Sequence, residues 1–512
     1  MAALPPDFRD RRGDRVLLIW GGLPYWTVAD RQAERLIDAL VAGSGRAEAL
    51  QKVAGDRPAP EVVRDAAKLL ASLRRAGVVG GRRLPPPKQR IESITINVTN
   101  RCNLACTFCY NRGTAGGTAG GTAGGTAGGT AGGTAGGTAG GTAGGPAGGT
   151  AGRHGNGGRL ESLPHGRQTA DGGGLEGSRH GRTADHRELS AAEMIQALDE
   201  LRGQYAPGGA LALLGGEPLL EPDKTLELAA WGVRRKLKPI VSTNGLLMTP
   251  DFARRAAAIG LECQVSIDGA EAESHEAIRG KGTFDRALAA VKCLAQEGAY
   301  GIMSMVFHSG NVDQIPAYLE LALQSGAREA RFIPIKAIAG GSQYHLPDLV
   351  QVIRSVVRAV AKRPELQALL GRDYVSILAQ TCRSCSPRQS CGTGCQTFLL
   401  DADGTVYPCL NLSCPEMAAG NVLVEPFRKI WSLSMVSKQV REQTTLAGRP
   451  RTCGKCFARH FCMGGCRGET YANTGRLDAP SVTCAQGRAA IVQTMWTLAD
   501  NPWLVGRRAA HC

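Results

Sequence analysis

Short apolar runs separated by amphipathic stretches dominate the chain after residue 90. Apolar residues alternate through Ile94, Ile96 and Val98, and five further short apolar runs follow. These runs lie at 211–214, 239–242, 263–267, 302–307 and 331–335. The stretches between them have helical character, so strands and helices alternate as in consecutive βαβ units. The pattern therefore predicts an α/β region with six strands over residues 91–340.

The first 90 residues show a different pattern. Two apolar runs at 15–20 and 23–28 are joined by Gly21 and Gly22, which predicts a pair of short strands. Apolar residues then recur with a helical period, at Ala33, Leu36, Ile37 and Leu40 and again at Val62, Ala66, Leu69, Leu70 and Leu73. The order of strand pair, helix, short helix and long helix is typical of a winged helix-turn-helix domain.

A low-complexity segment interrupts the α/β region. The tetrad Thr-Ala-Gly-Gly is repeated eight times from Thr114 to Gly145, and Gly-rich polar sequence continues to about Arg187. Such a composition cannot bury enough apolar area to offset its ordering entropy, so we expect residues 113–188 to be a disordered insert. The insert contains His154, His165, His180 and His186, so a metal-binding role is the alternative to a solvated linker.

Composition narrows the class of protein. The 512 residues carry a formal net charge of +15, which suits an acidic peptide or a nucleic acid as partner or serves solubility alone. No run of about 18 apolar residues and no apolar signal segment is present, which predicts a cytoplasmic protein without a membrane span. For the 17 cysteines, metal ligation is then a better interpretation than disulfides.

Three of these cysteines stand close together as Cys102-x3-Cys106-x2-Cys109. Three thiolates can hold three irons of a [4Fe–4S] cluster and leave the fourth iron open to a small molecule, whereas four cysteines close the cluster of a ferredoxin. A zinc knuckle or a chance cluster is the alternative, although zinc usually takes four ligands.

The cysteine run, with Phe108 in it, resembles the signature of radical S-adenosylmethionine (SAM) enzymes. The resemblance implies a partial (β/α)6 barrel in which the open iron chelates the amino and carboxylate groups of SAM. It also implies further SAM contacts. Phe108 would lie near the adenine, Gly215, Gly216, Glu217 and Pro218 near the amino group, Ser242 and Asn244 near the ribose and methionine, Ser266 and Asp268 at the ribose hydroxyls, and Arg279 at the carboxylate.

The last third of the chain holds a second cysteine pattern, which resembles the SPASM domain. That resemblance implies two auxiliary [4Fe–4S] clusters, one on Cys385, Cys391, Cys409 and Cys466 and the other on Cys453, Cys456, Cys462 and Cys484. Two zinc ions are the alternative, since Cys-x2-Cys spacing also suits zinc. Cys382, Cys395 and Cys414 are extra thiols, either further ligands, hydrogen donors or substrate contacts, or small core residues.

The N-terminal pattern resembles the PqqD-like element that binds leader peptides, with a DNA-binding winged helix as the alternative. Together the parts resemble a radical SAM/SPASM peptide maturase. The predicted domains are leader recognition at 1–90, the barrel at 91–340, a helical linker at 341–380, the SPASM domain at 381–490, and a C-terminal helix and tail at 491–512.

This resemblance implies reductive cleavage of SAM to a 5′-deoxyadenosyl radical, which abstracts hydrogen from a ribosomally made precursor peptide. A thioether or carbon–carbon crosslink or an epimerised residue would result, and an electron donor such as flavodoxin or ferredoxin would be needed. The alternatives are a protein maturase of the formylglycine-generating type and a winged-helix iron–sulfur redox regulator.

Overall fold

The computed structural model describes residues 3–55, 59–80, 90–111, 187–371, 374, 390–445 and 451–505. These residues belong to one compact unit of the chain. The predicted disordered insert lies outside the described residues, except for its last two residues, Arg187 and Glu188. Cys382, Cys385 and Cys512 also lie outside the described residues.

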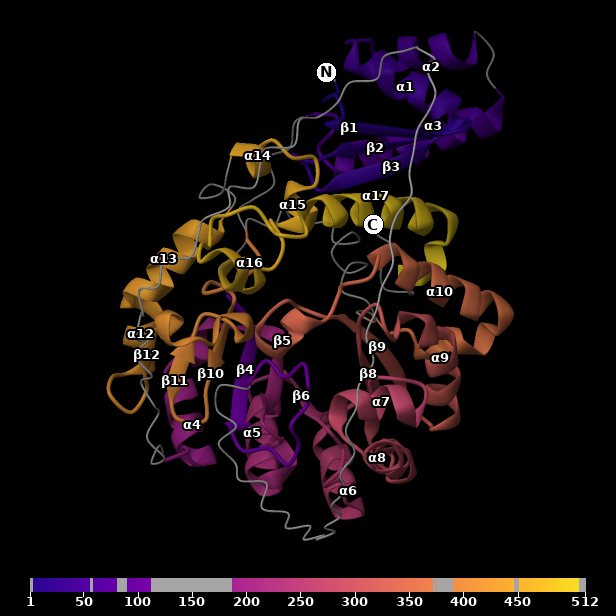
Figure 1. Ribbon diagram of the computed structural model, residues 1–512. Coiled ribbons are helices and arrows are strands. Elements are labelled where there is room, and N and C mark those ends of the chain that lie inside the picture. Colours follow the sequence, from indigo (N-terminus) through magenta and orange to yellow (C-terminus); the bar gives the residue numbers. More distant parts are fainter. Residues whose placement is uncertain are drawn as a thin grey trace, which may run out of the picture. The chain divides into compact units, whose positions relative to one another are not determined.

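The N-terminal segment forms an antiparallel three-stranded sheet and three helices (Figure 1). Its elements are β1 (Phe8–Arg12), β2 (Arg15–Trp20), β3 (Tyr25–Ala29), α1 (Arg31–Val41), α2 (Arg46–Ala54) and α3 (Pro60–Arg75). The sequence predicted β2, β3 and the helix order but missed β1, which has the charged sequence FRDRR. Backbone pairing with β2, and not apolar alternation, makes β1 a strand.

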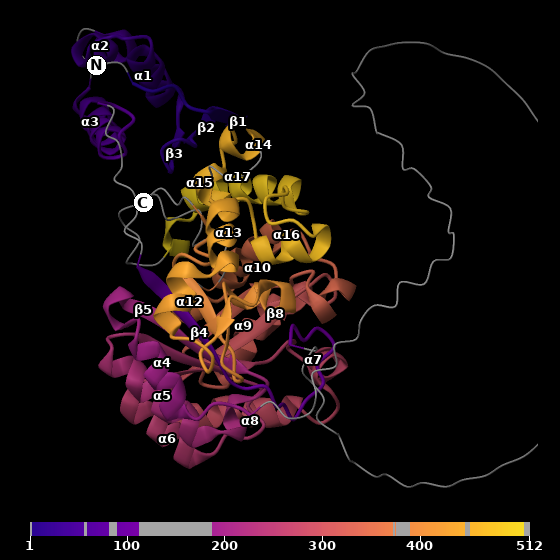
Figure 2. The ribbon, with the colours of Figure 1, turned by 90° about the vertical axis from the view of Figure 1, so that its left-hand side faces the viewer.

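The apolar run of β2 is buried on both of its faces. Val16, Leu18 and Trp20 pack with the helices of the N-terminal segment. Leu17 and Ile19 point the other way and pack with Phe461, Ile491, Met495 and Trp496 from the C-terminal part of the chain. In Figures 1 and 2, α17 (Cys484–Asp500) accordingly lies along this second face of the sheet.

Six parallel strands form the partial barrel. They are β4 (Ile91–Thr99), β5 (Tyr205–Gly215), β6 (Lys238–Thr243), β7 (Glu262–Ser266), β8 (Tyr300–Phe307) and β9 (Glu329–Pro334), hydrogen-bonded in that order. The helices on their outer side are α4 (Ala191–Asp199), α5 (Pro222–Arg234), α6 (Pro250–Ile259), α7 (Ala272–Arg279), α8 (Phe284–Gln296) and α9 (Ile315–Gln324) (Figure 1). The prediction of a six-stranded radical SAM-type barrel is therefore confirmed.

The two faces of the barrel sheet differ in chemistry. The face toward the helices is apolar and fully buried, as Leu211, Val241 and Cys263 illustrate. The strand register places polar residues on the opposite, inner face, together with the apolar Ala212, Leu214, Ile240 and Ile302. The polar residues are Thr95, Asn97, Ser242, Gln264, Ser266 and Ser304. Period-2 alternation thus gives the sheet a mixed inner face that offers polar groups to a ligand at the strand ends.

The cysteine-rich C-terminal part extends the same sheet. Strand β10 (Thr397–Leu400) pairs parallel to β4, and β11 (Thr405–Tyr407) and β12 (Gly420–Asn421) follow antiparallel. Its helices are α12 (Phe427–Leu433), α13 (Met435–Thr444), α14 (Arg451–Gly454), α15 (Arg459–Cys462), α16 (Arg467–Thr474) and α17. The last helix begins at Cys484 and ends at Asp500, so the start predicted at residue 491 was wrong.

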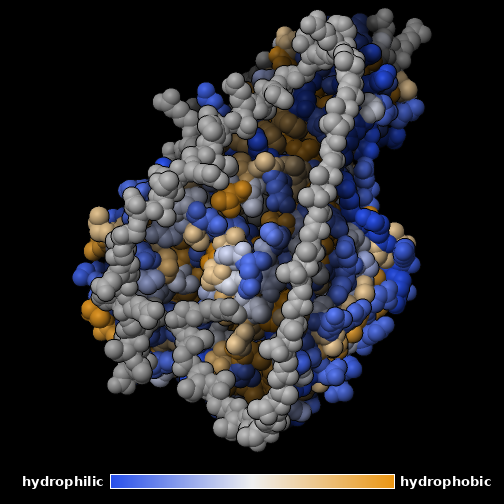
Figure 3. All heavy atoms as spheres, in the orientation of Figure 1, coloured by the Kyte–Doolittle hydropathy of each residue, from blue (hydrophilic) through white to orange (hydrophobic). Residues whose placement is uncertain are grey.

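Two further features complete the described chain. Helix α10 (Leu349–Lys362) occupies the region predicted as a helical linker. No helix in the described ranges is long and apolar enough to cross a bilayer. In Figure 3, hydrophilic side chains gather over the N-terminal helices, where Arg35, Arg64 and Lys68 are exposed.

Candidate active site and auxiliary cluster sites

The loop that follows β4 carries the three closely spaced cysteines. Residues 100–111 form neither helix nor strand; Cys102 is exposed, and Cys106 and Cys109 are partly buried. Backbone N–H groups of Leu104 and Asn111 point at the sulfurs of Cys102 and Cys109, each at 3.4 Å. The loop thus presents thiols with local N–H donors, the arrangement that stabilises thiolate ligands.

Burial makes two of the three thiols weaker acids. It raises the pKa of Cys102 to about 11 and also raises the pKa of Cys106. A coordinating thiol is deprotonated outright, so iron binding at this loop must release protons.

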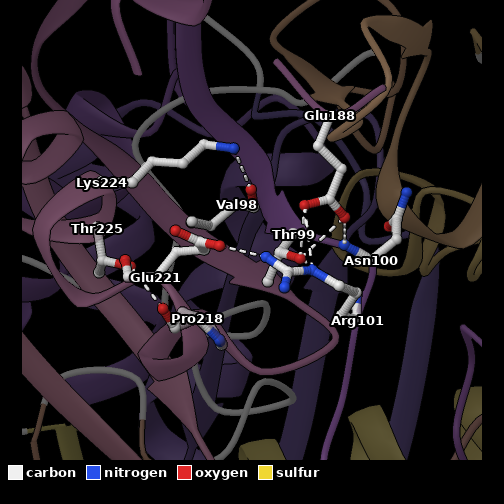
Figure 4. A network of polar contacts seen from close by, with 9 residues as sticks. All are labelled: Val98, Thr99, Asn100, Arg101, Glu188, Pro218, Glu221, Lys224 and Thr225. Carbon is white, nitrogen blue, oxygen red and sulfur yellow. Dashed lines mark hydrogen bonds and ion pairs between the residues drawn. The ribbon is translucent and has the colours of Figure 1, made fainter. Parts of the chain in front are cut away.

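A polar network supports the start of the loop (Figure 4). The Glu188 carboxylate accepts hydrogen bonds from the Thr99 hydroxyl at 2.8 Å and from the backbone N–H of Asn100 at 2.7 Å. Arg101 lies between Glu188 and Glu221 and pairs with both. Glu188 is therefore part of the site, and the prediction that the insert extends through residue 188 was wrong.

Lys224 makes a further hydrogen bond to the end of β4. The Lys224 ammonium donates to the carbonyl of Val98 at 2.6 Å (Figure 4). Burial lowers the pKa of Lys224. The strand end that precedes Cys102 is therefore held by Glu188, which lies before α4, and by Lys224 of α5.

Gly215 and Gly216 pack directly against this strand end. A Cβ at Gly215 would come within 2.2 Å of the Thr99 oxygen, and one at Gly216 within 2.0 Å of the Arg101 oxygen. The N–H of Gly216 donates to Thr99, and the N–H of Glu217 donates to Arg101 at 2.9 Å. Only glycine permits this approach, which sets the predicted SAM-binding segment beside the cysteine loop.

The Glu217 carboxylate ties β5 to β6. It is buried and accepts from the Leu219 N–H at 3.0 Å, the Thr243 hydroxyl at 2.6 Å and the Asn244 N–H at 2.8 Å. Burial raises the pKa of Glu217, with these hydrogen bonds opposing the shift. Three hydrogen bonds and burial thus fix the Glu217 carboxylate between β5 and β6. Pro218 follows as the first residue of a short 3-10 turn.

Asn244 connects the end of β6 to the cysteine loop. Its side-chain N–H donates to the Asn103 side-chain oxygen at 2.7 Å, and Asn103 is the residue after Cys102. Ser242 lies on the inner face of the sheet and accepts from Gln264 at 3.3 Å. Ser266 pairs with Ser304 on the same inner face. Ser242 and Ser266 are both partly exposed.

Asp268 and Arg279 form a buried ion pair, with Arg279 Nε 2.5 Å from Asp268 Oδ2. Asp268 is fully buried and also accepts from the Val306 N–H at 2.8 Å. Asp268 thus holds Arg279, and the predicted ribose contact competes with these two partners. Burial alone would lower the pKa of Arg279. The neighbouring charges of Asp268 and Cys106 outweigh burial, so the pKa of Arg279 is raised.

Arg279 also reaches the cysteine loop. Its Nη1 lies 3.9 Å from the Cys106 sulfur, and its guanidinium carbon lies 5.6 Å from the Phe108 ring centroid. Phe108 and Arg279 are therefore brought together as predicted neighbours of one ligand.

A segment after β9 covers the loop, and sequence reasoning missed it. The Tyr344 hydroxyl contacts the Thr107 hydroxyl, and Gln343 Nε2 donates to the Thr107 carbonyl at 2.7 Å. A Cβ at Gly340 would come within 2.5 Å of the same carbonyl. Glu469 of α16 accepts from the Ala337 N–H at 3.0 Å, so this segment joins the cysteine loop to the C-terminal domain.

The auxiliary cysteines gather in two groups. The charges of Cys391 and Cys466 act on Cys409, whose pKa burial raises to about 12. The charges of Cys484 and Cys456 act on Cys462, whose pKa burial raises as well. Each group holds three members of one predicted ligand set. The fourth member of the first set, Cys385, lies outside the described residues, and that of the second set, Cys453, lies in α14.

The extra thiols have separate surroundings. Burial raises the pKa of Cys395. The nearby charges of Arg441 and Cys391 act on the same thiol in opposite directions, Arg441 lowering its pKa and Cys391 raising it. Cys414 packs in an apolar cluster with Leu412 and Met417, and its pKa is raised to about 11.

One hydrogen bond supports the sulfur of a predicted auxiliary ligand. Asn411 donates to the Cys466 sulfur at 3.4 Å, an outer hydrogen bond of the kind that supports cluster ligands.

Comparison with known proteins agrees with this geometry. Residues 96–322 match the model of the Radical SAM superfamily, and residues 391–457 match that of an iron–sulfur cluster-binding domain, SPASM. Mycofactocin maturase MftC of Mycobacterium tuberculosis is 31% identical over 314 residues, which cover 60% of this chain and 77% of the relative. The chain belongs to the radical SAM superfamily.

Two further relatives are similarly close. AdoMet-dependent heme synthase of Methanosarcina barkeri is 29% identical over 56% of this chain and 85% of its own length. PqqA peptide cyclase of Granulibacter bethesdensis is 26% identical over 58% of this chain and 79% of its own length. The prediction of a radical SAM enzyme with iron–sulfur clusters and SAM as cofactors is thereby confirmed.

Solved structures share the fold. Native anSMEcpe with bound AdoMet has a TM-score of 0.54 at 15% identity and covers 80% of this chain and 99% of its own. Streptococcus suis SuiB, solved with its precursor peptide SuiA, has a TM-score of 0.50 at 14% identity and covers 93% of this chain and 100% of its own. At these identities the likeness concerns the fold alone.

Proposed function

We propose that this chain modifies a ribosomally made precursor peptide whose leader binds residues 1–90. The N-terminal unit carries this proposal. It has its own apolar core around Val16, Leu36 and Leu73, and it packs against the C-terminal helix through Leu17 and Ile19. A separate folded unit docked on a radical SAM enzyme supports binding of a macromolecular substrate, and its exposed basic helices suit an acidic leader.

The residues at the strand ends have complementary roles in this proposal. Cys102, Cys106 and Cys109 would hold the SAM-binding cluster, and Gly215–Pro218 would offer backbone groups to the SAM amino group. Arg279, oriented by Asp268, would pair the SAM carboxylate in bidentate fashion. When bound, the reduced cluster supplies one electron that splits SAM into methionine and a 5′-deoxyadenosyl radical. The protein contributes orientation and exclusion of water.

Hydrogen-atom transfer from the peptide to the deoxyadenosyl radical yields 5′-deoxyadenosine and a peptide radical. Formation of a thioether or carbon–carbon crosslink then requires loss of one further electron and one proton. An auxiliary cluster held by the SPASM cysteines is the proposed acceptor of that electron. Epimerisation instead requires return of a hydrogen atom, for which the extra thiols Cys395 and Cys414 are candidates.

The proposal includes an external one-electron donor such as flavodoxin or ferredoxin, and a cytoplasmic location. A second candidate is a small-molecule reaction, because a heme synthase is among the relatives of similar identity. The docked N-terminal unit favours the peptide substrate over this candidate.

The test is anaerobic reconstitution with iron and sulfide, followed by dithionite, SAM and candidate peptides encoded near the gene. Chromatography would quantify 5′-deoxyadenosine, and mass spectrometry would detect a change in the peptide. We expect deoxyadenosine to rise with one peptide and that peptide to change mass. Iron-replete protein that forms deoxyadenosine but modifies no peptide, and instead consumes a porphyrin substrate, would contradict the proposal.

Surface substitutions in the full-length chain test the leader-binding role. A variant with Arg35, Arg64 and Lys68 changed to Glu should still cleave SAM, because these side chains are exposed and the cysteine loop and its supports lie after residue 90. The same protein should bind the leader at least about tenfold more weakly, a loss of roughly 1.4 kcal/mol. Equal leader affinity in the wild type and in this variant would remove the assigned role of these helices.

A further inference from the structure

Arg467 is a buried cation, and only one of its three guanidinium nitrogens has a hydrogen-bond partner in the described structure. It is 1% exposed and begins α16 directly after Cys466. Its Nη1 donates to the carbonyls of Leu477 and Ala479 at 3.0 and 2.8 Å. Its Nε and Nη2 are shielded from solvent and have no hydrogen-bond partner in the described structure.

This arrangement is costly unless an anion lies nearby. Buried charges in proteins are normally paired, and an unpaired buried ion costs several kcal/mol. Within the described ranges no ion pair includes Arg467. The carboxylate of Asp478 is half-exposed and is already paired with Arg476 at 2.9 Å.

The surroundings of Arg467 point to the missing anion. A Cβ at Gly465 would lie 3.9 Å from Arg467 Nη2 and 2.7 Å from the Ser481 hydroxyl. Gly465 stands between Cys462 and Cys466, and the Ser481 carbonyl accepts from the Cys484 N–H at 3.0 Å. The guanidinium therefore lies among segments that carry thiols of both predicted auxiliary clusters.

We propose that Arg467 faces an auxiliary [4Fe–4S] cluster, donates its free N–H groups to cluster sulfur and raises the reduction potential of that cluster. A cluster with four thiolate ligands is an anion, and reduction adds one more negative charge. A fixed cation and N–H donors stabilise the reduced form more than the oxidised form, so the potential rises. This role rests on the proposed function, in which an auxiliary cluster accepts an electron from the substrate.

The test is an EPR-monitored redox titration of the full-length chain. Cys102, Cys106 and Cys109 are first changed together to Ala, so that the remaining signals come from auxiliary clusters. Arg467→Gln is compared with Arg476→Gln, which removes the same charge from an exposed site paired with Asp478. No peptide and no SAM cleavage is involved, so the result is independent of the peptide-maturase proposal.

We expect R467Q to shift the midpoint potential of one auxiliary cluster to a more negative value, while R476Q leaves both potentials unchanged. Iron-replete R467Q with both potentials unchanged would overturn the proposal, as would a background protein that binds no auxiliary iron. If R467Q loses iron, the same titration is made with Arg467→Lys. This variant keeps the positive charge but not the planar guanidinium with its several N–H donors. A smaller negative shift of the cluster potential in R467K supports the proposal, and an unchanged potential overturns it.

Discussion

The two cysteine-rich regions of this chain place their thiols in different ways. Cys102, Cys106 and Cys109 lie on a loop without regular structure at the end of β4, and Cys102 is exposed. In the C-terminal domain four of the described cysteines stand at or beside the ends of secondary structure. Cys409 follows β11, Cys462 ends α15, Cys466 precedes α16 and Cys484 begins α17.

Each region also places a buried arginine near cysteine, with opposite electrostatic surroundings. Arg279 is neutralised by Asp268, whereas Arg467 has no carboxylate partner among the described residues. A site that binds a ligand carboxylate needs an oriented guanidinium, and Asp268 supplies that orientation. A site that stores an electron gains from an uncompensated positive charge. Under the proposed function, the first cysteine region would serve ligand binding and the second would serve electron storage.

The largest expected effect separates the two regions outright. Cys106→Ala should abolish SAM cleavage and remove about four irons per chain, because two thiolates do not hold the SAM-binding cluster, while auxiliary iron stays. Iron and sulfide analysis with a deoxyadenosine assay measures both. The matched variant Cys409→Ala should lose auxiliary iron and retain SAM cleavage. SAM cleavage at the normal rate in C106A would refute the assignment of this loop.

Replacement of Arg279, the partner of Asp268, should lower both the stability of the fold and the affinity for SAM. Arg279→Gln leaves a buried carboxylate unpaired, which destabilises the fold by about 3–5 kcal/mol. SAM binding should weaken about tenfold or more, since a bidentate partner is lost. The double variant with Asp268→Asn should recover most of the thermal stability but not the SAM affinity. Thermal unfolding and SAM titration followed by EPR distinguish the two effects; unchanged SAM affinity in R279Q would contradict the role.

A smaller effect is expected from the network below the loop. Glu188→Gln removes the charge that Arg101 pairs with and one of the acceptors for Thr99 and Asn100, at a cost of about 1–2 kcal/mol. The SAM-cluster occupancy should fall and the KM for SAM should rise a few-fold, with auxiliary iron unchanged. The exposed Glu273→Gln on α7 serves as control. Equal loss of iron in both regions would show that Glu188 acts on global stability instead.

The last prediction concerns the effect of pH on stability, and we expect no change in iron content or SAM cleavage from it. His275 is buried behind the ion pair and accepts from the Asp268 N–H at 3.1 Å, and burial lowers its pKa to about 4. The unfolded chain binds this proton at about pH 6.5, so stability falls as pH drops from about 6.5 to about 4, by up to roughly 3 kcal/mol. Urea unfolding of wild type and His275→Gln between pH 5 and 8 measures this. A variant with the same pH slope as wild type would exclude His275 as its source.

Much of the fold was predictable because it rests on local periodicity. The six barrel strands follow from short apolar runs, and the cysteine and glycine motifs fall at their carboxyl ends, where parallel strands bring loops together. Strand β1 was missed because its charged residues carry no alternation and only pairing with β2 makes it extended. The start of α17 was placed too late because Cys484 was read only as a ligand.

The candidate site was predictable in its ligands but not in its supports. Cys102, Gly215 and Arg279 belong to motifs of distinctive spacing. Glu188 was assigned to the insert, and Tyr344 and Glu469 belong to no motif. Their roles depend on contacts between residues more than 80 positions apart, which spacing along the chain does not encode.

Neighbouring residues along the chain set the elements, the two cysteine patterns and the chemistry that thiolates in those patterns support. Long-range contacts in the folded chain set which partners those residues meet. The apolar run of β2 required burial on both faces, but folding chose Phe461 and Trp496 as the second cover. In the same way, burial of Arg467 beside Cys466 follows from long-range packing, since enclosure from solvent is a property of the assembled chain.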